Sequence, residues 1–142
     1  MSGDHRIECL YLSQEDLLRA GCLDLDLAMT AAEEAMLSFR DGSILFPEKI
    51  VQIFDESTQE RINCLPATLL AEKICGMKWV SVFPRNPVQH GAQNLSAVVV
   101  LSEIERGFPI AFMDGTLCSN VRVGAMGGVA AKHFARPNSE SI

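Results

Sequence analysis

Hydrophobic positions in the first third of the chain recur with the period of a helix. Small and apolar side chains return every three to four residues in a segment that predicts a helix from Asp24 or Asp26 to about Arg40. A shorter helix, 15–20, is predicted to begin after a serine of the kind that caps helix N-termini. We expect these two helices to serve as a scaffold, because neither carries a pattern of reactive side chains.

Short apolar runs bounded by turn residues follow and predict β-strands. The runs lie at 44–46, 49–54, 61–65, 75–83, 95–101 and 108–113, and another short strand is predicted at 7–12. Pro66 is expected to end the strand at 61–65, and Pro109 places the last strand at an edge or near its own start. Alternation along 75–83 puts Lys78 and Val80 on the same face of that strand.

A helix rich in small residues is predicted from Asp114-Gly115 to about Ala135. Amide groups at such a helix start lack intrahelical partners and attract anions. Glycines at 124, 127 and 128 each reduce helix stability by roughly 1 kcal/mol relative to alanine. We therefore expect another element to pack close to this helix, and we prefer the sheet as that element. Arg122, about two turns into the helix, suits either an anion site or a structural ion pair.

The order of these elements predicts an α+β domain over residues 1–137. Two N-terminal helices precede a mixed or largely antiparallel sheet of about five to six strands, and the small-residue helix comes last. The strands follow one another mostly through turns, which argues against a doubly wound parallel sheet.

Composition and charge exclude several classes of function. The formal net charge of −6 argues against nucleic acid or an anionic membrane as the main partner. No apolar run approaches the ~20 residues needed to span a bilayer, and the polar N-terminus predicts a cytoplasmic protein. The five cysteines form no C-x-x-C pair and the three histidines are far apart, so we expect free thiols and no metal site.

Several cations are candidates for binding a small acid. Lys78 interrupts an apolar strand, and a buried ammonium group needs an anion beside it. Lys49, Arg61 and Arg122 could converge with it on a small acid, but a solvated sheet face is the stronger explanation for Lys49 and Arg61. The glycines near the C-terminus are not a dinucleotide fingerprint, because they lie inside a helix and not in the turn before it.

Eight short segments, in this order, resemble the ornithine cyclodeaminase/mu-crystallin family. They are Tyr11–Ser13, Pro47–Lys49, Leu65–Ala67, Gly76–Lys78, Phe83–Pro87, Met113–Gly115, Arg122 and Ala130–His133. The resemblance implies a substrate-binding and dimerisation domain, followed by an NAD(P)-binding Rossmann domain and a C-terminal segment that returns to the first domain. This chain resembles the first part, and residues 138–142 are expected to begin a linker or strand into the Rossmann domain, which is absent here.

The resemblance also implies roles for individual residues. Lys49, Lys78 and Arg122 match family positions that bind the substrate, and Lys78 is the expected catalytic residue of this part. Asn94 stands where many members have a threonine near the cofactor and substrate. Lysine at 49 keeps the charge of the usual arginine but loses its two-point geometry. Val123-Gly124 replaces a Thr-Ala pair that is common in the family.

The implied chemistry is oxidoreduction at the Cα–N bond of a small amino or imino acid, with hydride exchanged with NAD(P). Hydrolysis, cyclisation with loss of ammonia (a lyase reaction) or further reduction would then follow. We expect the 142-residue chain to form a homodimer, to bind no cofactor alone and to be inactive alone. The alternative is a non-catalytic oligomerisation or small-acid-binding module.

Overall fold

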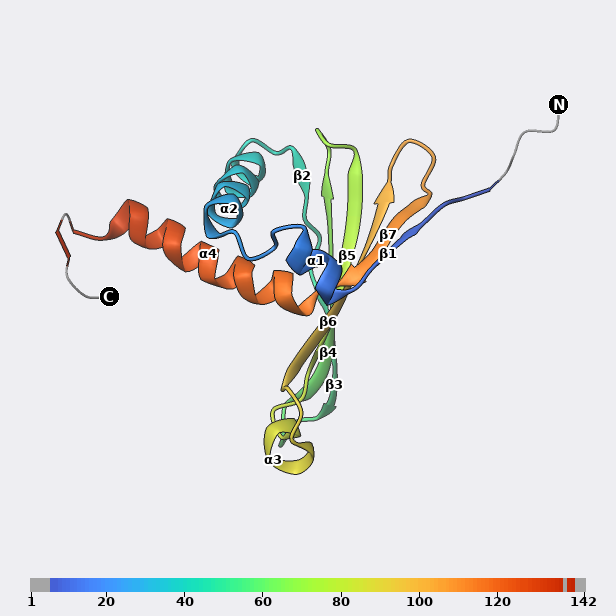
Figure 1. The fold of residues 1–142 in the computed structure, drawn as a ribbon, viewed down its shortest axis with the longest axis vertical. Coiled ribbons are helices and arrows are strands. Elements are labelled where there is room, and N and C mark those ends of the chain that lie inside the picture. Colours follow the sequence, from blue (N-terminus) through green and yellow to red (C-terminus); the bar gives the residue numbers. More distant parts are fainter. Residues whose placement is uncertain (1–5, 137, 140–142) are drawn as a thin grey trace.

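The computed structural model describes residues 6–136, 138 and 139, which form the predicted α+β fold (Figure 1). The strands are β1 (Leu10–Leu12), β2 (Ile44–Leu45), β3 (Ile50–Asp55), β4 (Glu60–Leu69), β5 (Ile74–Val82), β6 (Leu95–Glu103) and β7 (Pro109–Asp114). The helices are α1 (Gln14–Arg19), α2 (Leu25–Arg40), α3 (Asn86–His90) and α4 (Thr116–Phe134). The short helix α3 lies in a segment that the sequence predicted as a loop.

The sheet is mixed, as predicted. Its strand order is β1-β7-β6-β5-β4-β2, and β3 pairs with β4 as well. Only the β1–β7 pair is parallel among the described strands. Strand β1 therefore pairs with β7, at the edge of the sheet opposite to β2 and β3. Residues 140–142, part of the predicted linker, lie outside the described residues.

Strand β4 runs through Pro66, so the prediction that this proline ends the strand is wrong. On one edge of β4, β3 pairs with residues up to Cys64, and β2 begins its pairing at Thr68. Residues 65–67 thus have no strand partner on that edge. A residue without an N–H group costs no ladder hydrogen bond there, which is why the strand tolerates the proline.

The start of α1 is held by a reciprocal capping box. The Ser13 hydroxyl accepts a hydrogen bond from the Asp16 amide (3.2 Å), and the Asp16 carboxylate accepts one from the Ser13 amide (2.8 Å). Hydrogen bonds from Ser13 and Arg19 lower the pKa of Asp16 to about 2. The carboxylate form of Asp16 is therefore the one that stabilises the helix start.

We expect Asp16→Asn to remove a pH-dependent part of the stability. A carboxyl whose folded pKa is depressed stabilises the fold above its ordinary pKa of 3.8, and this stabilisation is lost as the pH falls towards 2. Urea unfolding from pH 6 to pH 2 should show wild type and variant converging as the pH falls. Glu34→Gln, which removes an exposed acid outside the capping box, is the matched control. A constant difference at all pH values would contradict the assignment.

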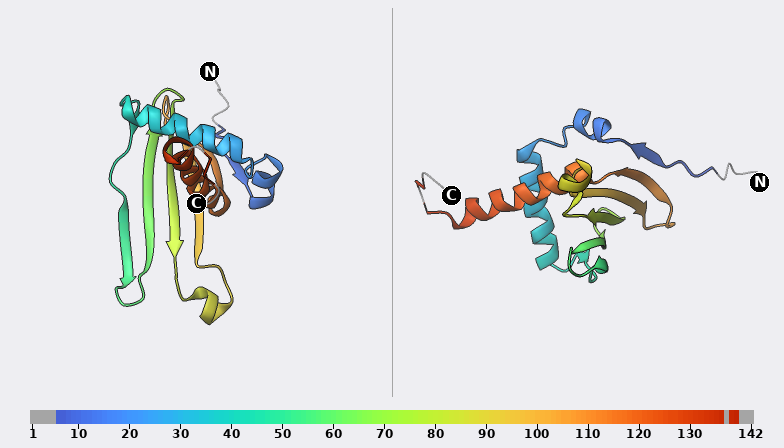
Figure 2. Two further views of the ribbon diagram at one scale, coloured as in Figure 1. Left: turned by 90° about the vertical axis from the view of Figure 1, so that its left-hand side faces the viewer. Right: turned by 90° about the horizontal axis from the view of Figure 1, so that it is seen from below.

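Helices α2 and α4 lie on one side of the sheet (Figure 2). Val80 and Ala97, which pair directly across β5 and β6, are buried on this helix-covered face. The start of α4 is fixed to β6, because the Gly115 amide donates to the Ala97 carbonyl (2.8 Å) and the Thr116 hydroxyl accepts from the Ala97 amide (2.9 Å). Lys78 shares this face with Val80, as the alternation predicted.

The glycines of α4 do not pack against the sheet, which corrects the preferred interpretation. A Cβ atom on Gly128 would lie 3.0 Å from the Met29 sulfur on α2, and positions 124 and 127 have nothing within 4 Å. The close approach to the sheet occurs instead at Gly115, where a Cβ atom would lie 3.1 Å from the backbone carbon of Val98. Close packing at Gly128 is therefore between helices.

No helix among the described residues is long and apolar enough to cross a membrane.

Candidate carboxylate-binding site

Lys78 lies in the middle of β5 and points towards α4. Its ammonium group donates a hydrogen bond to the Ser119 hydroxyl (2.9 Å), and its side chain is half-buried. Burial lowers the pKa of Lys78 below its usual 10.5, and the positive charge of Arg122 lowers it further. The structure therefore brings together Lys78 and Arg122, two of the residues that the sequence predicted for the site.

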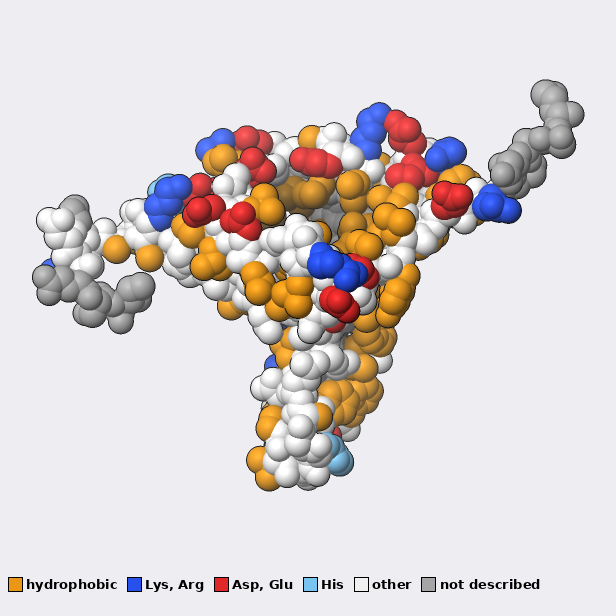
Figure 3. All heavy atoms as spheres, in the orientation of Figure 1, with side chains coloured by type: hydrophobic (Ala, Val, Ile, Leu, Met, Phe, Trp, Pro, Cys, Tyr) orange, Lys and Arg blue, Asp and Glu red, His pale blue; other side chains and the backbone are white. Residues whose placement is uncertain are grey.

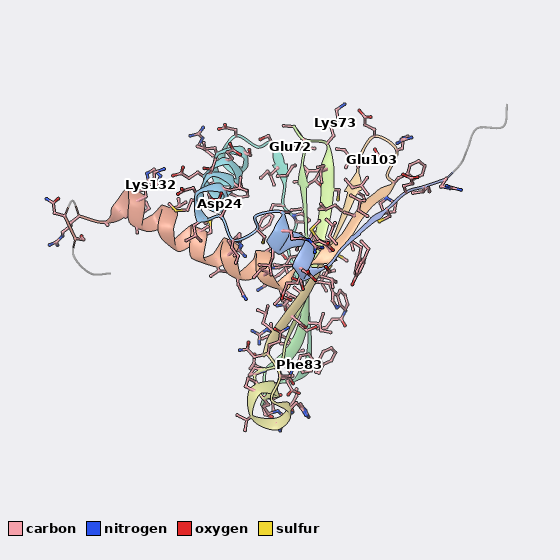
Figure 4. All side chains as sticks on the ribbon, viewed as in Figure 1. Asp24, Glu72, Lys73, Phe83, Glu103 and Lys132 are labelled. Carbon is pink, nitrogen blue, oxygen red and sulfur yellow. The ribbon has the colours of Figure 1, made fainter. Side chains whose placement is uncertain are left out.

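No carboxylate within the described part of the chain neutralises this pair of cations. Neither Lys78 nor Arg122 has an Asp or Glu oxygen within 4.0 Å. Other cations do have such partners, which are Arg19–Glu15, Arg40–Asp41, Lys73–Glu105, Arg85–Glu60, Arg106–Glu103 and Lys132–Glu33. Lys132, at the far end of α4 (Figure 4), forms an ordinary ion pair of this kind with Glu33. The pair Lys78–Arg122 thus has the charge needed to bind an external anion.

The N-terminus of α4 does not provide an anion site, contrary to the prediction. A carboxylate oxygen of Asp114 already accepts hydrogen bonds from the amides of Thr116 (3.1 Å) and Leu117 (3.2 Å). An acid in this place repels a phosphate and occupies the amides that would hold it. The β7–α4 turn therefore does not fit the pyrophosphate of a dinucleotide.

Lys49 is exposed and lies directly before β3. Ile50 pairs with Cys64, which pairs with Trp79, so the register puts residue 49 level with Lys78, two strands away. Two strand spacings are about 10 Å. A long side chain at 49 can reach towards the pair of cations, although no contact joins them.

Asn94 is not brought together with Lys78. Its carbonyl accepts a hydrogen bond from the Phe83 amide (2.8 Å), and Phe83 lies in the arm that points away from the helices (Figure 4). On β6, the residue opposite Lys78 is Val99. Asn94 lies five residues before Val99, which corresponds to about 17 Å along the chain. Arg61 is also remote, because it pairs with Val82, and its guanidinium donates to the Gln59 carbonyl (2.7 Å).

Ser119, the hydrogen-bond partner of Lys78, was not predicted from the sequence. Ser119 and Thr116 are the buried polar side chains of the described residues, at 8% and 6% exposure. Thr116, Ser119 and Arg122 follow one another at intervals of three residues on an otherwise apolar helix. This spacing puts polar groups on neighbouring turns of one helix face and was the available signal.

A cavity of about 640 Å³ opens beside Arg122. It is open to solvent on one side and lies between α2, β2 and α4, and its lining includes Cys22, Ala32, Met36, Phe46, Cys118 and Met126. Arg122 is the charged side chain of this otherwise apolar wall. The cavity combines a cationic edge with apolar walls, which suits a small acid with an apolar body.

No group of three or more metal-binding side chains occurs in the described ranges.

Comparison with known proteins identifies relatives of the chain. The profile of the ornithine cyclodeaminase/mu-crystallin family matches residues 14–142. An alanine dehydrogenase of Archaeoglobus fulgidus is 37% identical over 133 residues, which are 94% of this chain and 39% of the relative. The chain thus spans about two fifths of the length of this relative.

Solved structures with the same fold include two with bound nicotinamide cofactor. An archaeal alanine dehydrogenase dimer with bound NAD superposes with a TM-score of 0.82 at 37% identity, covering 92% of this chain and 38% of that one. A Thermococcus litoralis Delta(1)-pyrroline-2-carboxylate reductase in complex with NADH and L-proline gives 0.84 at 29% identity, covering 92% and 39%.

Proposed function

Because the chain belongs to the ornithine cyclodeaminase/mu-crystallin family, we propose that it is the substrate-binding part of an NAD(P)-dependent oxidoreductase or deaminase. The proposed substrate is a small amino or imino acid, and the reaction takes place at its Cα–N bond. Relatives named alanine dehydrogenase and Delta(1)-pyrroline-2-carboxylate reductase support this class of substrate. The five free thiols fit the cytoplasmic location that is part of the proposal.

The observation that carries the proposal is the unneutralised pair Lys78–Arg122. Burial and the positive charge of Arg122 lower the pKa of Lys78, so the empty site holds two like charges, and a carboxylate between them removes this repulsion. The arginine fork holds both oxygens, while the lysine adds a point charge. A carboxylate fixed in this way orients the adjacent Cα–N unit, which is the contribution required of a substrate-binding part.

Lys49 and Asn94 have secondary roles in the proposal. Lys49 approaches the substrate from the edge of the sheet, and its contact forms when the acid binds. Asn94 remains a predicted cofactor contact, remote from the cation pair. The start of α4 does not fit the pyrophosphate of a dinucleotide, because Asp114 occupies its amides. The pyrophosphate is therefore assigned to another part of the protein, with Asn94 as the predicted contact from this chain.

We also propose a homodimer formed through the sheet face opposite the helices. The chain exposes 10304 Å², whereas a folded monomer of 15.5 kDa exposes about 7,200 Å². The excess, about 3,000 Å² for one chain, is larger than the ~800 Å² per partner that a standard interface buries. Hydrophobic side chains gather along one side of the arm that contains β3 and β4 (Figure 3), and Ile50 and Phe54 are 60% and 56% exposed. The solved archaeal alanine dehydrogenase is a dimer.

The alternative is a non-catalytic module that binds small acids or oligomerises. The misfit between the β7–α4 turn and a dinucleotide favours this reading for the isolated chain. Both functions use the same cation pair, so carboxylate binding alone does not separate them.

A chimera separates the two functions. The 142-residue chain would replace the matching part of the A. fulgidus alanine dehydrogenase. We expect the chimera to bind NAD and to oxidise or reduce a small amino or imino acid, whereas the chain alone shows no turnover. A chimera that folds and binds NAD but turns over none of the tested acids would favour the non-catalytic module. Turnover by the chain alone would contradict the assignment of the cofactor to another part.

A further inference from the structure

Two cysteines that are distant in the sequence meet at the wall of the cavity. The sulfur of Cys22 lies 3.4 Å from the sulfur of Cys118, although 96 residues separate them. Both side chains are half-buried, and both line the cavity of about 640 Å³. A small reagent that enters the cavity therefore reaches both thiols.

Local structure explains why these thiols meet. Cys22 lies in the tight turn between α1 and α2, where Gly21 adopts a φ of +86° and the Cys22 amide donates to the Leu17 carbonyl (3.0 Å). Cys118 lies in the first turn of α4, which is fixed to β6 through Thr116. One thiol is thus on a turn that can adjust and the other is on a rigid helix.

From this geometry we infer that Cys22 and Cys118 form a dithiol that low-molecular-weight disulfides oxidise to an intramolecular disulfide. A sulfur–sulfur bond is about 2.05 Å long, so the two atoms must approach by about 1.4 Å. Small rotations of both side chains and a shift of the turn at Cys22 supply this movement. The bond ties the α1–α2 turn to α4, one helical turn before Arg122. This inference does not depend on the proposed function.

The reaction begins at Cys22. Burial, the hydrogen bond with Cys22 and the charge of Asp114 raise the pKa of Cys118 to about 11, so this thiol stays protonated at neutral pH. The Cys22 thiolate attacks one sulfur of the small disulfide, whose S–S bond breaks and releases one thiolate. That thiolate takes the proton of Cys118. The Cys118 sulfur then attacks the Cys22 sulfur and displaces the second small thiolate, which takes up from the solvent the proton that Cys22 released when it ionised.

The balance of the reaction is simple. Two protein thiols lose two hydrogens and become one disulfide, while one small disulfide is reduced to two thiols. The other cysteines are not expected to compete for Cys118, because Cys22 is the cysteine that contacts it among the described residues. The closed loop constrains the unfolded chain over nearly a hundred residues, so oxidation should raise Tm by on the order of 10 °C.

Glutathione disulfide tests the inference on the 142-residue chain. After oxidation, tryptic digestion should yield peptide 20–40 linked to peptide 107–122, each of which contains one cysteine. The intact mass should fall by about 2 Da from loss of two hydrogens, and dithiothreitol should reverse the change. Cys75→Ser is the matched control and should leave the linked peptides unchanged.

Single variants test the order of the two attacks. Cys118→Ser should trap one glutathione on Cys22, whereas Cys22→Ser should leave Cys118 unmodified under the same conditions. The inference is overturned if wild type yields glutathione adducts without the linked peptides. It is also overturned if the linked peptides contain Cys9, Cys64 or Cys75 in place of Cys22 or Cys118.

Discussion

Replacing Arg122 by alanine should lower kcat/KM for the amino or imino acid at least about 100-fold in the NAD-binding chimera, with NAD affinity unchanged. Two charge-assisted hydrogen bonds to the carboxylate are lost, each worth about 1.5–3 kcal/mol. Since 1.4 kcal/mol corresponds to a tenfold change, a 100-fold loss is the lower end of the expected range. Arg106→Ala is the matched control, because Arg106 pairs with Glu103 on the β6–β7 turn.

Lys78→Met should reduce kcat/KM to a similar extent, and its effect on stability makes the test sharper. Lys78 carries a lowered pKa because of burial and the charge of Arg122, so removing its charge relieves a repulsion in the empty site. We therefore expect Tm of the 142-residue chain to stay the same or rise. A structural lysine would instead lose stability on substitution. Unchanged kinetics in both variants, or a large fall in Tm for Lys78→Met, would remove the pair from the site.

The pH dependence of substrate binding follows from the lowered pKa of Lys78. The charged form of Lys78 binds the acid, so affinity should be highest at low to neutral pH and should fall as the pH rises through the lowered pKa. The midpoint of that fall should lie below the usual lysine value of 10.5. In Lys78→Met this part of the pH profile should be absent.

Replacing both Ile50 and Phe54 by lysine should convert the expected dimer into a monomer. Each apolar side chain contributes about 1.5–3 kcal/mol when an interface covers it, and an uncompensated ammonium group adds a further cost. The dissociation constant should therefore rise by more than about 100-fold. Sedimentation velocity at micromolar concentration measures the change directly.

Phe134→Lys is the control for this substitution. Phe134 is 87% exposed but lies at the end of α4, on the helix side of the molecule. The control should leave the dimer intact. A wild-type monomer, or a dimer that persists in the double variant, would contradict the proposed interface.

Local sequence patterns were sufficient to predict most of the fold. The period of apolar residues located α2, the small-residue composition after Asp114-Gly115 located α4, and alternation placed Lys78 and Val80 on one face of β5. Pro66 was misjudged because its tolerance depends on which strands flank β4, and this is settled by tertiary pairing. The helix α3 is a single short turn with proline near its start, which resembles a loop in composition.

The candidate site was predicted only in part. Lys78 and Arg122 were singled out by charge in apolar surroundings, and the structure brings them together. Ser119 was missed because one serine in a small-residue helix carries little information without the facing strand. The helix-start prediction failed because the acid that caps it, Asp114, precedes the helix and reads as a turn residue. The contact between Cys22 and Cys118 depends on tertiary packing and has no local signal.

The most direct test of the carboxylate site is an NMR titration of the 142-residue chain with L-alanine and, separately, with ethylamine. Ethylamine is alanine without its carboxylate. We expect L-alanine to shift the amide signals of Ser119 and Arg122 in a saturable way, and ethylamine to leave them unchanged. Equal shifts with both compounds, or shifts with neither, would contradict the assignment of Lys78 and Arg122 as a carboxylate-binding pair.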